Sequence, residues 1–370
     1  MRFVFIVQGE GRGHLTQAIS LHQILTRQGH EVCEVMVGRS RSREIPEFFA
    51  KRIGAPVSTF SSPNFRLDSR RRGVSVFGTF FENVSRMPSF VHSLVTLRRA
   101  MRYYYPDIIV NFYDPLAAIY AVLWRPKTKI VCIAHQYMML HPEFVFPRGR
   151  RGARWALLLY TRLTAWGADV CLGLSFREMR GLPERKLVVM PPLLRAETKK
   201  LRQSTEDFIL AYVLNDGYAE DLVAWHRRHP EVEILGFWDR KDAPDVTYLR
   251  DKLVFRQLDD VAFLDAMSRC RGLVSTAGFE SICEAMYLGK PVYMIPTEHQ
   301  IEQHCNAIDA YLAGAGLWGF DLDLTRFLDY IPEHQVKTEK FREWVHSAEL
   351  VYIDLLGRAL HKRDPVSAGC

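Results

Sequence analysis

"FVFIVQGEGRGHLTQA" (Phe3–Ala18) joins a short apolar run to a glycine-rich loop and then to an amphipathic pattern. This order predicts a buried strand, a tight turn and a helix, which is how a parallel α/β sheet begins. Gly9 and Gly11 match the start of a G-x-G-x-x-G dinucleotide fingerprint, but His14 stands where the third glycine belongs. The predicted second strand ends at Arg39, where an NAD site needs an acidic residue. The loop is therefore not interpreted as a dinucleotide site.

Strand and helix patterns alternate along the rest of the chain. The predicted strands lie at 2–8, 31–37, 56–60, 107–113, 129–134, 169–174, 208–213, 232–235, 252–255, 272–276 and 291–296. A polar stretch with paired prolines at 188–207 predicts a linker between two series. We expect an α/β protein with two Rossmann-like domains, 1–195 and 196–349, whose parallel sheets face a central cleft. A helix at about 350–370 would pack back onto the first domain.

Charge is unevenly distributed along the 370 residues. The formal net charge is +7, but residues 1–195 hold 29 basic and 13 acidic side chains, a net +16, and the remainder carries −9. Such a difference in net charge between the two halves indicates that the first half binds an anionic partner.

The cysteines and the hydropathy pattern bear on the cellular compartment. Seven cysteines are scattered along the chain, an odd number without any C-x-x-C pair, which is typical of reduced thiols. The first apolar run is too short for a signal peptide, and no run reaches the ~18 residues of a spanning helix. We expect a cytoplasmic protein.

Two polar side chains are predicted at the carboxyl edge of the first sheet. His14 begins the first helix, and Asp114 follows a predicted strand just before Pro115. Each has a structural alternative, because His14 can bond locally and Asp114 can cap a helix. Beside one another, however, a carboxylate holds the tautomer of an imidazole, so His14 is the candidate base and Asp114 its orienting partner. The glycines that leave room for a ligand in front of this histidine are Gly9, Gly11 and Gly13.

The second half contains "STAGFESICEAMYLGKPVYMIPTEHQIEQHCNA" (Ser275–Ala307), which predicts a strand, a turn and a helix. The free N–H groups of that helix could bind a diphosphate, Ser281 could donate to a phosphate oxygen, and Glu284 could accept from ribose hydroxyls. The structural alternatives are an ordinary helix serine and a solvated surface charge. The candidate donor-binding residues are Asn215, Thr276, Gly278, Ser281, Glu284, Glu302, Gln303 and Asn306.

This segment resembles the nucleotide-sugar motif of GT-B glycosyltransferases. The most similar families are the UDP-glucuronosyltransferases and the N-acetylglucosaminyltransferase that makes lipid II. The residues that carry the resemblance are Gly278, Ser281, Glu284, the "GKP" of 289–291, Pro296, Glu302, Gln303, Asn306 and Ala307. "GRGH" (11–14) resembles the turn before the catalytic histidine of these families, and "PDIIVNFYDPLAA" (106–118) resembles the strand before their histidine-orienting aspartate.

The sequence also departs from the family pattern. Ala277 replaces the first glycine of the turn, and Ser275-Thr276 stands where plant-type relatives have a histidine motif. The loop at 214–221 is poorer in glycine than in the lipid-linked relatives, although Asn215 and Gly217 could still contact phosphate.

The resemblance implies an inverting glycosyltransferase of GT-B architecture. A nucleotide diphosphate-sugar, foremost a UDP-sugar, would bind the second domain, and His14 would deprotonate an acceptor hydroxyl bound by the first. A helix N-terminus would stabilise the departing diphosphate, so neither a metal nor a cofactor is expected. The D-x-D at Asp321–Asp323 is expected to cap a helix rather than bind manganese. A sugar-nucleotide epimerase and a non-catalytic sugar-nucleotide-binding protein remain as alternatives.

Basic and aromatic residues interleave in the first half. Arg70, Arg71 and Arg72 precede several phenylalanines and valines, and a second mixture of this kind spans 147–166. One interpretation is a core with a solvated basic face. The other is an anionic membrane surface with a lipid-linked acceptor, which would make the protein peripheral to the inner face of the membrane. Nucleic acid is not expected, because no binding module accompanies the charge.

Overall fold

The structure is a computed structural model that describes residues 1–40, 45–63, 85–212, 216–240, 243–298, 300–335 and 338–361. The contacts divide it into two compact units. Unit 1 contains residues 1–144 and 151–195 together with the described residues from Trp344 onward. Unit 2 contains residues 145–150 and 196–343.

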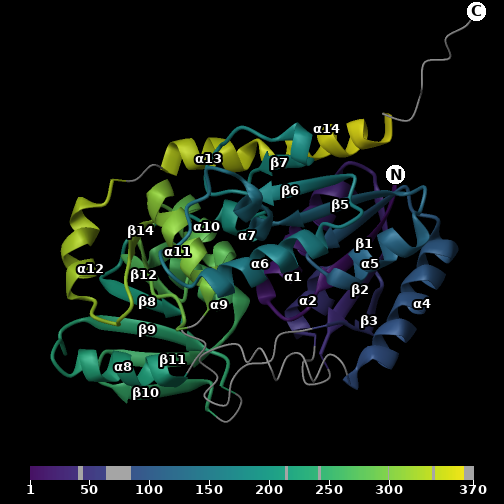
Figure 1. Cartoon of the computed structure of the whole chain (residues 1–370). Helices are drawn as coiled ribbons and strands as arrows, with labels where there is room; N and C mark the ends of the chain where they lie inside the picture. Colours follow the sequence, from purple (N-terminus) through teal and green to yellow (C-terminus); the bar gives the residue numbers. More distant parts are fainter. Residues whose placement is uncertain are drawn as a thin grey trace, which may run out of the picture. The chain divides into compact units, whose positions relative to one another are not determined.

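Unit 1 is built on a seven-stranded parallel sheet in the order β3-β2-β1-β4-β5-β6-β7 (Figure 1). Its strands are β1 (Arg2–Gln8), β2 (Glu31–Arg39), β3 (Val57–Ser61), β4 (Ile108–Phe112), β5 (Lys129–Ala134), β6 (Val170–Leu174) and β7 (Leu187–Met190). Near-continuous apolar runs form them because helices cover both faces of the sheet. The strand order reverses between β1 and β4, which are neighbours, and ligands of such sheets bind where the order reverses.

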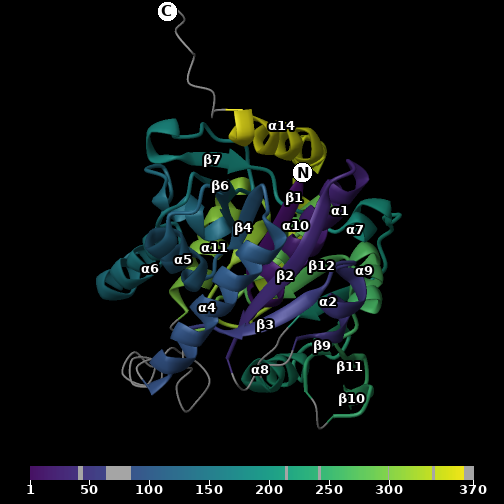
Figure 2. The same cartoon turned by 90° about the vertical axis from the view of Figure 1, so that its right-hand side faces the viewer.

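The helices of unit 1 lie in two groups. They are α1 (Arg12–Arg27), α2 (Glu47–Arg52), α4 (Met87–Tyr104), α5 (Pro115–Trp124), α6 (Arg151–Thr164), α14 (Ala348–His361) and the 3-10 helices η1 (His135–Leu140) and η2 (Pro183–Arg185). Figure 2 shows α4 and α5 beside the sheet. Leu97 of α4, Leu116 of α5 and Ile6 of β1 belong to one buried core cluster. The connection β1–α1–β2 lies on the other face, as right-handed crossovers require. α14 is tied to unit 1 by a hydrogen bond from Tyr352 Oη to the carbonyl of Pro191 (3.2 Å).

Unit 2 repeats this plan with the strand order β10-β11-β9-β8-β12-β13-β14. Its strands are β8 (Phe208–Tyr212), β9 (Glu233–Trp238), β10 (Val246–Arg250), β11 (Leu253–Gln257), β12 (Gly272–Ser275), β13 (Val292–Met294) and β14 (Gly316–Trp318). Its helices are α7 (Ala196–Lys200), α8 (Asp216–His226), α9 (Asp260–Arg269), α10 (Phe279–Tyr287), α11 (Ile301–Ala313), α12 (Thr325–Tyr330) and the 3-10 helix η3 (Ile331–Glu333); α13 (Thr338–His346) crosses the boundary between the units. Here the order reverses between β8 and β12.

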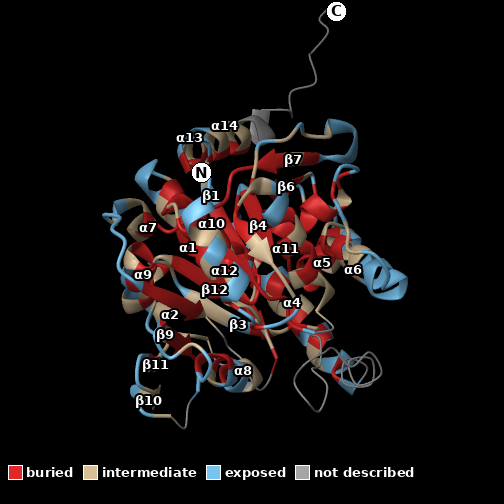
Figure 3. Ribbon diagram, turned by 90° about the vertical axis from the view of Figure 1, so that its left-hand side faces the viewer, coloured by how far each residue is buried: buried red, intermediate tan, exposed pale blue. Residues whose placement is uncertain are grey.

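The predicted fold class is confirmed. The structure differs from the prediction in having three further strands, β7, β10 and β14, and in the antiparallel direction of one of them. β7 occupies the beginning of the predicted linker, because its four residues pair with β6 and complete the sheet of unit 1. β10 runs antiparallel to β11 at the edge of an otherwise parallel sheet. The buried strands of both units are shown in Figure 3.

Candidate functional site

The glycine-rich loop of unit 1 follows β1 at the point where the strand order reverses. The N–H of Gly9 donates to the carbonyl of Gly38 at 2.7 Å, and a Cβ on Gly9 would lie 2.7 Å from the Val37 side chain. Gly9 is therefore needed for close contact between the loop and β2. Gly11 is the residue before α1 and has open space around it, and Gly13 lies in the first turn of α1.

His14 is the third residue of α1 and is almost fully buried. Its Nδ1 lies 3.3 Å from Oε1 of Gln17, one turn further along the helix. With the proton on Nδ1 donated to that oxygen, Nε2 keeps its lone pair. Burial lowers the pKa of His14 to about 4, although the hydrogen bond to Gln17 opposes the shift. The imidazole is thus neutral at pH 7, which is the form that accepts a proton.

Tyr113 packs against His14 from the turn after β4. The two rings are stacked, with centroids 5.6 Å apart and planes at 24°. Tyr113 has a positive φ of 66°, a conformation that costs free energy in a bulky residue and persists only where its surroundings enforce it. Its hydroxyl lies 2.7 Å from Thr161 Oγ1, and this hydrogen bond holds the ring in place.

Asp114 follows Tyr113 and is completely buried. Its Oδ1 accepts from the N–H of Leu116 at 2.8 Å, so the carboxylate caps α5 with Pro115 in the first turn. Its Oδ2 accepts from Ser62 Oγ at 2.7 Å. Burial raises the pKa of Asp114 to about 6, while the hydrogen bonds from Ser62 and the first turn of α5 lower it.

The structure does not join His14 to Asp114 by a hydrogen bond among the described residues. The expected orienting bond is instead made by Gln17, and both oxygens of Asp114 serve the cap and Ser62. The two residues nevertheless lie at the ends of neighbouring strands, because β1 pairs with β4. Gln17 was missed from sequence; its only signal was a spacing of three residues from His14 on a helix.

The corresponding turn of unit 2 connects β12 to α10. Thr276 is buried, Ala277 has a positive φ of 61°, and Gly278 precedes the first residue of α10 without any side-chain cap. The first N–H groups of the helix therefore lack a capping side chain. A left-handed conformation is strained for alanine and free for glycine, so the departure at Ala277 has a physical cost.

Two predicted donor residues of α10 already have protein partners. Ser281 Oγ donates to the carbonyl of Gly278 at 3.1 Å and lies 3.3 Å from Ser275 Oγ. Glu284 is buried, and its Oε1 accepts from Thr198 Oγ1 of α7 at 3.2 Å. Glu284 is not the solvated surface charge of the structural alternative.

The beginning of α11 is connected to this turn. Asn306 Nδ2 donates to the carbonyl of Ala277 at 3.1 Å, while its Oδ1 is buried without a hydrogen-bond partner. Gln303 Oε1 accepts from the N–H of Thr297 at 2.7 Å. His304, which was not predicted, is buried with both ring nitrogens unbonded and packs edge-on against Phe320. Among the described residues, these buried polar atoms of α11 thus have no hydrogen-bond partner.

The remaining predicted residues are placed as follows. Glu302 lies in the first turn of α11, half-buried, and Asn215 lies outside the described residues. Asp323 Oδ1 accepts from the N–H of Thr325, the first residue of α12, and from Trp225 Nε1; the N-cap position itself is Leu324, so Asp323 lies one residue before the expected cap. Within the described ranges, no group of three or more His, Cys, Asp or Glu side chains is arranged to hold a metal ion.

The sequence matches the profile of glycosyl transferase family 1 over residues 1–333. No curated protein sequence matches the chain. Solved structures match over nearly the whole length. UGT2 of Phytolacca americana, complexed with UDP-2fluoro-glucose and pterostilbene, has a TM-score of 0.65 and 12% identity, and the match covers 97% of this chain and 100% of that one.

Two further structures show the same fold. The calicheamicin glycosyltransferase CalG4 gives a TM-score of 0.63 at 14% identity, covering 99% of this chain and 100% of its own. MurG of Acinetobacter baumannii gives 0.55 at 14% identity, covering 96% and 99%. These likenesses confirm the fold that the sequence resemblance implied. The chain therefore belongs to glycosyl transferase family 1 and is a nucleotide-sugar-dependent glycosyltransferase with the GT-B fold.

Proposed function

We propose that this enzyme inverts the configuration of the transferred sugar and that His14 is its general base. The observation that carries the proposal is the hydrogen bond between His14 Nδ1 and Gln17 Oε1. It leaves Nε2 as the basic nitrogen of a neutral imidazole at the carboxyl end of β1. Among the described residues, the side chain of His14 bonds to Gln17 and stacks on Tyr113.

In the proposed reaction, Nε2 of His14 takes the proton of an acceptor hydroxyl as its oxygen attacks the anomeric carbon of the donor. A new carbon–oxygen bond forms, and the bond to the diphosphate breaks on the opposite face. The electron pair leaves with the nucleoside diphosphate, so one displacement inverts the anomeric centre. The imidazolium then returns its proton to solvent or to the leaving group.

Asp114 acts in this scheme as a positioning residue. Its carbonyl accepts from Asn111 Nδ2 at 3.1 Å and its N–H donates to Asn111 Oδ1 at 2.8 Å. These bonds, with the cap of α5, fix the turn whose strained residue is Tyr113. Tyr113 in turn stacks on His14, so Asp114 orients the imidazole through a ring contact.

Unit 2 is the proposed donor-binding part. The uncapped N-terminus of α10 would stabilise the departing diphosphate, which makes a divalent metal unnecessary. Glu284 would bind ribose hydroxyls by exchanging its bond to Thr198, and Glu302, Gln303 and Asn306 would bind the sugar. A UDP-sugar is the preferred donor, in keeping with the UDP-2fluoro-glucose bound by UGT2 of Phytolacca americana.

The experiment that tests this function combines a ligand screen with product analysis. A panel of nucleotide sugars is first ranked by thermal stabilisation, since a ligand at 100 Kd adds roughly 2.7 kcal/mol. The best donor is then incubated with an acceptor library, and the anomeric configuration of the product is determined by NMR. A product of opposite configuration supports the proposal, and retention contradicts it. Epimerised sugar without acceptor would identify an epimerase, and binding without any turnover would identify a non-catalytic protein.

We further propose that the acceptor lies at an anionic membrane surface, which unit 1 meets through α6. Trp155, Leu159 and Trp166 are exposed in and just after this helix, which Figure 3 shows largely at the surface. Arg151, Arg154 and Arg162 accompany them, and the helix contains no acidic residue. Exposed tryptophan beside arginine is typical of interfacial helices. Among the described residues, no helix is long and apolar enough to cross a bilayer.

Vesicle flotation tests this membrane contact. The doubly substituted Trp155→Ala/Trp166→Ala protein should lose most of its binding to phosphatidylcholine vesicles containing phosphatidylglycerol. High salt should weaken the binding of the wild-type protein to the same vesicles. Tyr248→Ala, at an exposed aromatic of unit 2, is the matched control and should float normally. Wild-type protein that stays unbound at low salt would indicate a soluble acceptor. Arg70, Arg71 and Arg72, the other basic residues predicted for this role, lie outside the described residues.

A further inference from the structure

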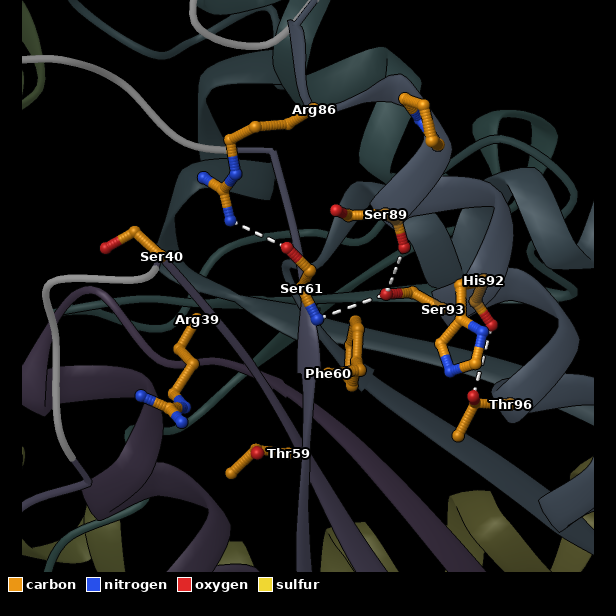
Figure 4. A pocket seen from close by; sticks show the side chains of 11 residues that line it. Arg39, Ser40, Thr59, Phe60, Ser61, Arg86, Ser89, His92, Ser93 and Thr96 are labelled. Carbon is orange, nitrogen blue, oxygen red and sulfur yellow. Dashed lines mark hydrogen bonds between the residues drawn. The ribbon is translucent and has the colours of Figure 1, made fainter.

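A cavity of about 730 Å³ in unit 1 has no part in the site described above. It lies where β2 and β3 end and α4 begins, so it opens at the carboxyl edge of the sheet. Figure 4 shows Arg39 and Ser40 on one side, residues of α4 on the other, and Ser61 between them. Its lining is Arg39, Ser40, Thr59, Phe60, Ser61, Arg86, Pro88, Ser89, His92, Ser93 and Thr96.

Arg86 is the unusual member of this lining. It is 8% exposed, yet no carboxylate in the described part of the chain pairs with it. Its Nη2 donates to Ser61 Oγ at 2.7 Å, and its guanidinium lies 5.4 Å from the centre of the Phe90 ring. Among the described residues, its buried Nε has no hydrogen-bond partner. A buried cation is costly unless a counter-charge accompanies it, so an anion bound here would stabilise this arrangement.

The surrounding groups favour the same kind of ligand. Arg86 immediately precedes α4, an 18-residue helix with no side-chain cap and no acidic residue in its first turn. Pro88, the second residue of α4, has no N–H, so the N–H groups of this helix end that can attract phosphate are those of Met87 and Ser89. The lining adds a second arginine, a histidine and several hydroxyls, and its described residues include no acidic side chain. Glu10 accepts from the N–H of Ser40, one of the lining residues, at 2.7 Å.

The cavity adjoins the residues around His14 through two short connections. Ser62, next to Ser61, donates to Asp114. Gly38, next to Arg39, accepts from Gly9 and has no room for a Cβ beside the Asp114 carboxylate. Two lining residues, Ser61 at the end of β3 and Arg39 at the end of β2, are therefore next in sequence to residues that contact the proposed catalytic site.

We propose that this cavity binds a phosphate group of the acceptor substrate, held by Arg86, Ser61 and the N-terminus of α4. The inference rests on the proposed function only in assigning the phosphate to the acceptor. The guanidinium and the helix N–H groups present several donors to the oxygens of one tetrahedral anion. The phosphate of a lipid-linked acceptor and that of a soluble phosphorylated acceptor share this chemistry.

Calorimetric titration of the full-length enzyme tests the proposal, with saturating UDP present to occupy the donor site. The probes are hexyl phosphate, inorganic phosphate and, as an uncharged comparison, hexyl glucoside. Wild type should bind hexyl phosphate saturably and hexyl glucoside far more weakly. Arg86→Gln should raise the Kd for hexyl phosphate at least about tenfold, the worth of a hydrogen bond to a charged group. Arg99→Gln, at an exposed arginine of α4, is the matched control and should change nothing.

The outcomes separate the cavity from the reaction. Equal affinities for inorganic and hexyl phosphate would mean that a free phosphate suffices, whereas binding of hexyl phosphate alone would indicate an alkyl-linked source. Absence of saturable binding by wild type, or an unchanged Kd in Arg86→Gln, would overturn the proposal. An unchanged midpoint of thermal unfolding shows that Arg86→Gln is folded, and Ser61→Ala is a milder second variant that should weaken binding in the same direction. Neither readout requires sugar transfer, so failure of the proposed reaction leaves this test intact.

Discussion

The turn after β1 in unit 1 and the turn after β12 in unit 2 are built alike and carry different chemistry. Each follows a strand where the sheet order reverses, and each leads through a glycine into a helix without a side-chain cap. His14 and Ser281 are both the third residue of their helices. Gln17 and Glu284 both stand three residues further on. The backbone of the two turns is thus alike at these positions, and the difference in their proposed chemistry comes from the side chains.

The partners of these residues show the difference. The imidazole of His14 is held by Gln17 within its own helix, which leaves Nε2 as a base. Ser281 turns back to Gly278, and Glu284 bonds outside the helix to Thr198. One turn is therefore arranged around a single proton acceptor and the other around a set of groups suited to an anion and hydroxyls.

The largest effect is expected at the base. His14→Ala should lower turnover by about 10² or more, because general base catalysis is worth that much, while UDP affinity stays at the wild-type value. His22→Ala, on the same helix, is the control and should retain activity. Turnover and UDP binding are measured by product formation and calorimetry. Near-normal turnover of His14→Ala would contradict the assignment of the general base to the turn after β1.

The orienting role of Gln17 should show in the pH profile of kcat/KM. Gln17→Leu should lower kcat/KM about tenfold, the worth of one hydrogen bond. Gln17→Glu places a negative charge beside the imidazole, which stabilises its protonated form and raises the pKa of His14. Since activity requires the neutral base, the acid limb, expected near pH 4 in wild type, should move to higher pH. An unmoved acid limb would assign the titrating group to another residue.

The donor turn is tested by comparing a nucleotide with its sugar conjugate. Glu284→Ala should lower the affinity for bare UDP and for UDP-sugar alike, by about tenfold, because the lost contact is to ribose. Glu302→Ala and Gln303→Ala should lower only the affinity for the UDP-sugar. Calorimetry with both ligands measures this division. If all three variants change UDP affinity equally, ribose and sugar contacts are not separated in this way.

The smallest effects concern the backbone of the two turns. Gly9→Ala would place a Cβ 2.8 Å from the Gly38 carbonyl and should lower the free energy of unfolding by about 1–3 kcal/mol. Ala277→Gly relieves a left-handed alanine but enlarges the unfolded ensemble, so its net change should stay within about 1 kcal/mol. Urea unfolding of each variant measures both. A larger decrease in the free energy of unfolding for Ala277→Gly than for Gly9→Ala would contradict this prediction.

Local pattern was sufficient to predict the fold. Apolar runs such as Phe3–Val7 can only be buried strands when helices alternate with them, and the capping pair Asp114-Pro115 marks the start of α5. The motif of unit 2 was recognisable because its spacing reflects one strand, one turn and one helix. β14 and β10, the edge strands of unit 2, have three and five residues and were not distinguished from loops, whereas the five-residue edge strand β3 was predicted.

By itself, the sequence determined which residues stand at the carboxyl ends of strands and the starts of helices, because both follow from hydrophobic periodicity and turn residues close to one another in the chain. Only the tertiary structure decided which of these side chains meet. His14 bonds to Gln17, and the two oxygens of Asp114 accept from Ser62 and from the N–H of Leu116. The environment of Arg86 is likewise invisible in sequence, since its burial, its bond to Ser61 and the lack of a carboxylate partner among the described residues depend on how β2, β3 and α4 pack. Hydrogen bonding and desolvation act between neighbours in space: one helix brings Gln17 to His14, whereas only the packing of segments far apart in the chain brings Ser62 to Asp114 and Ser61 to Arg86.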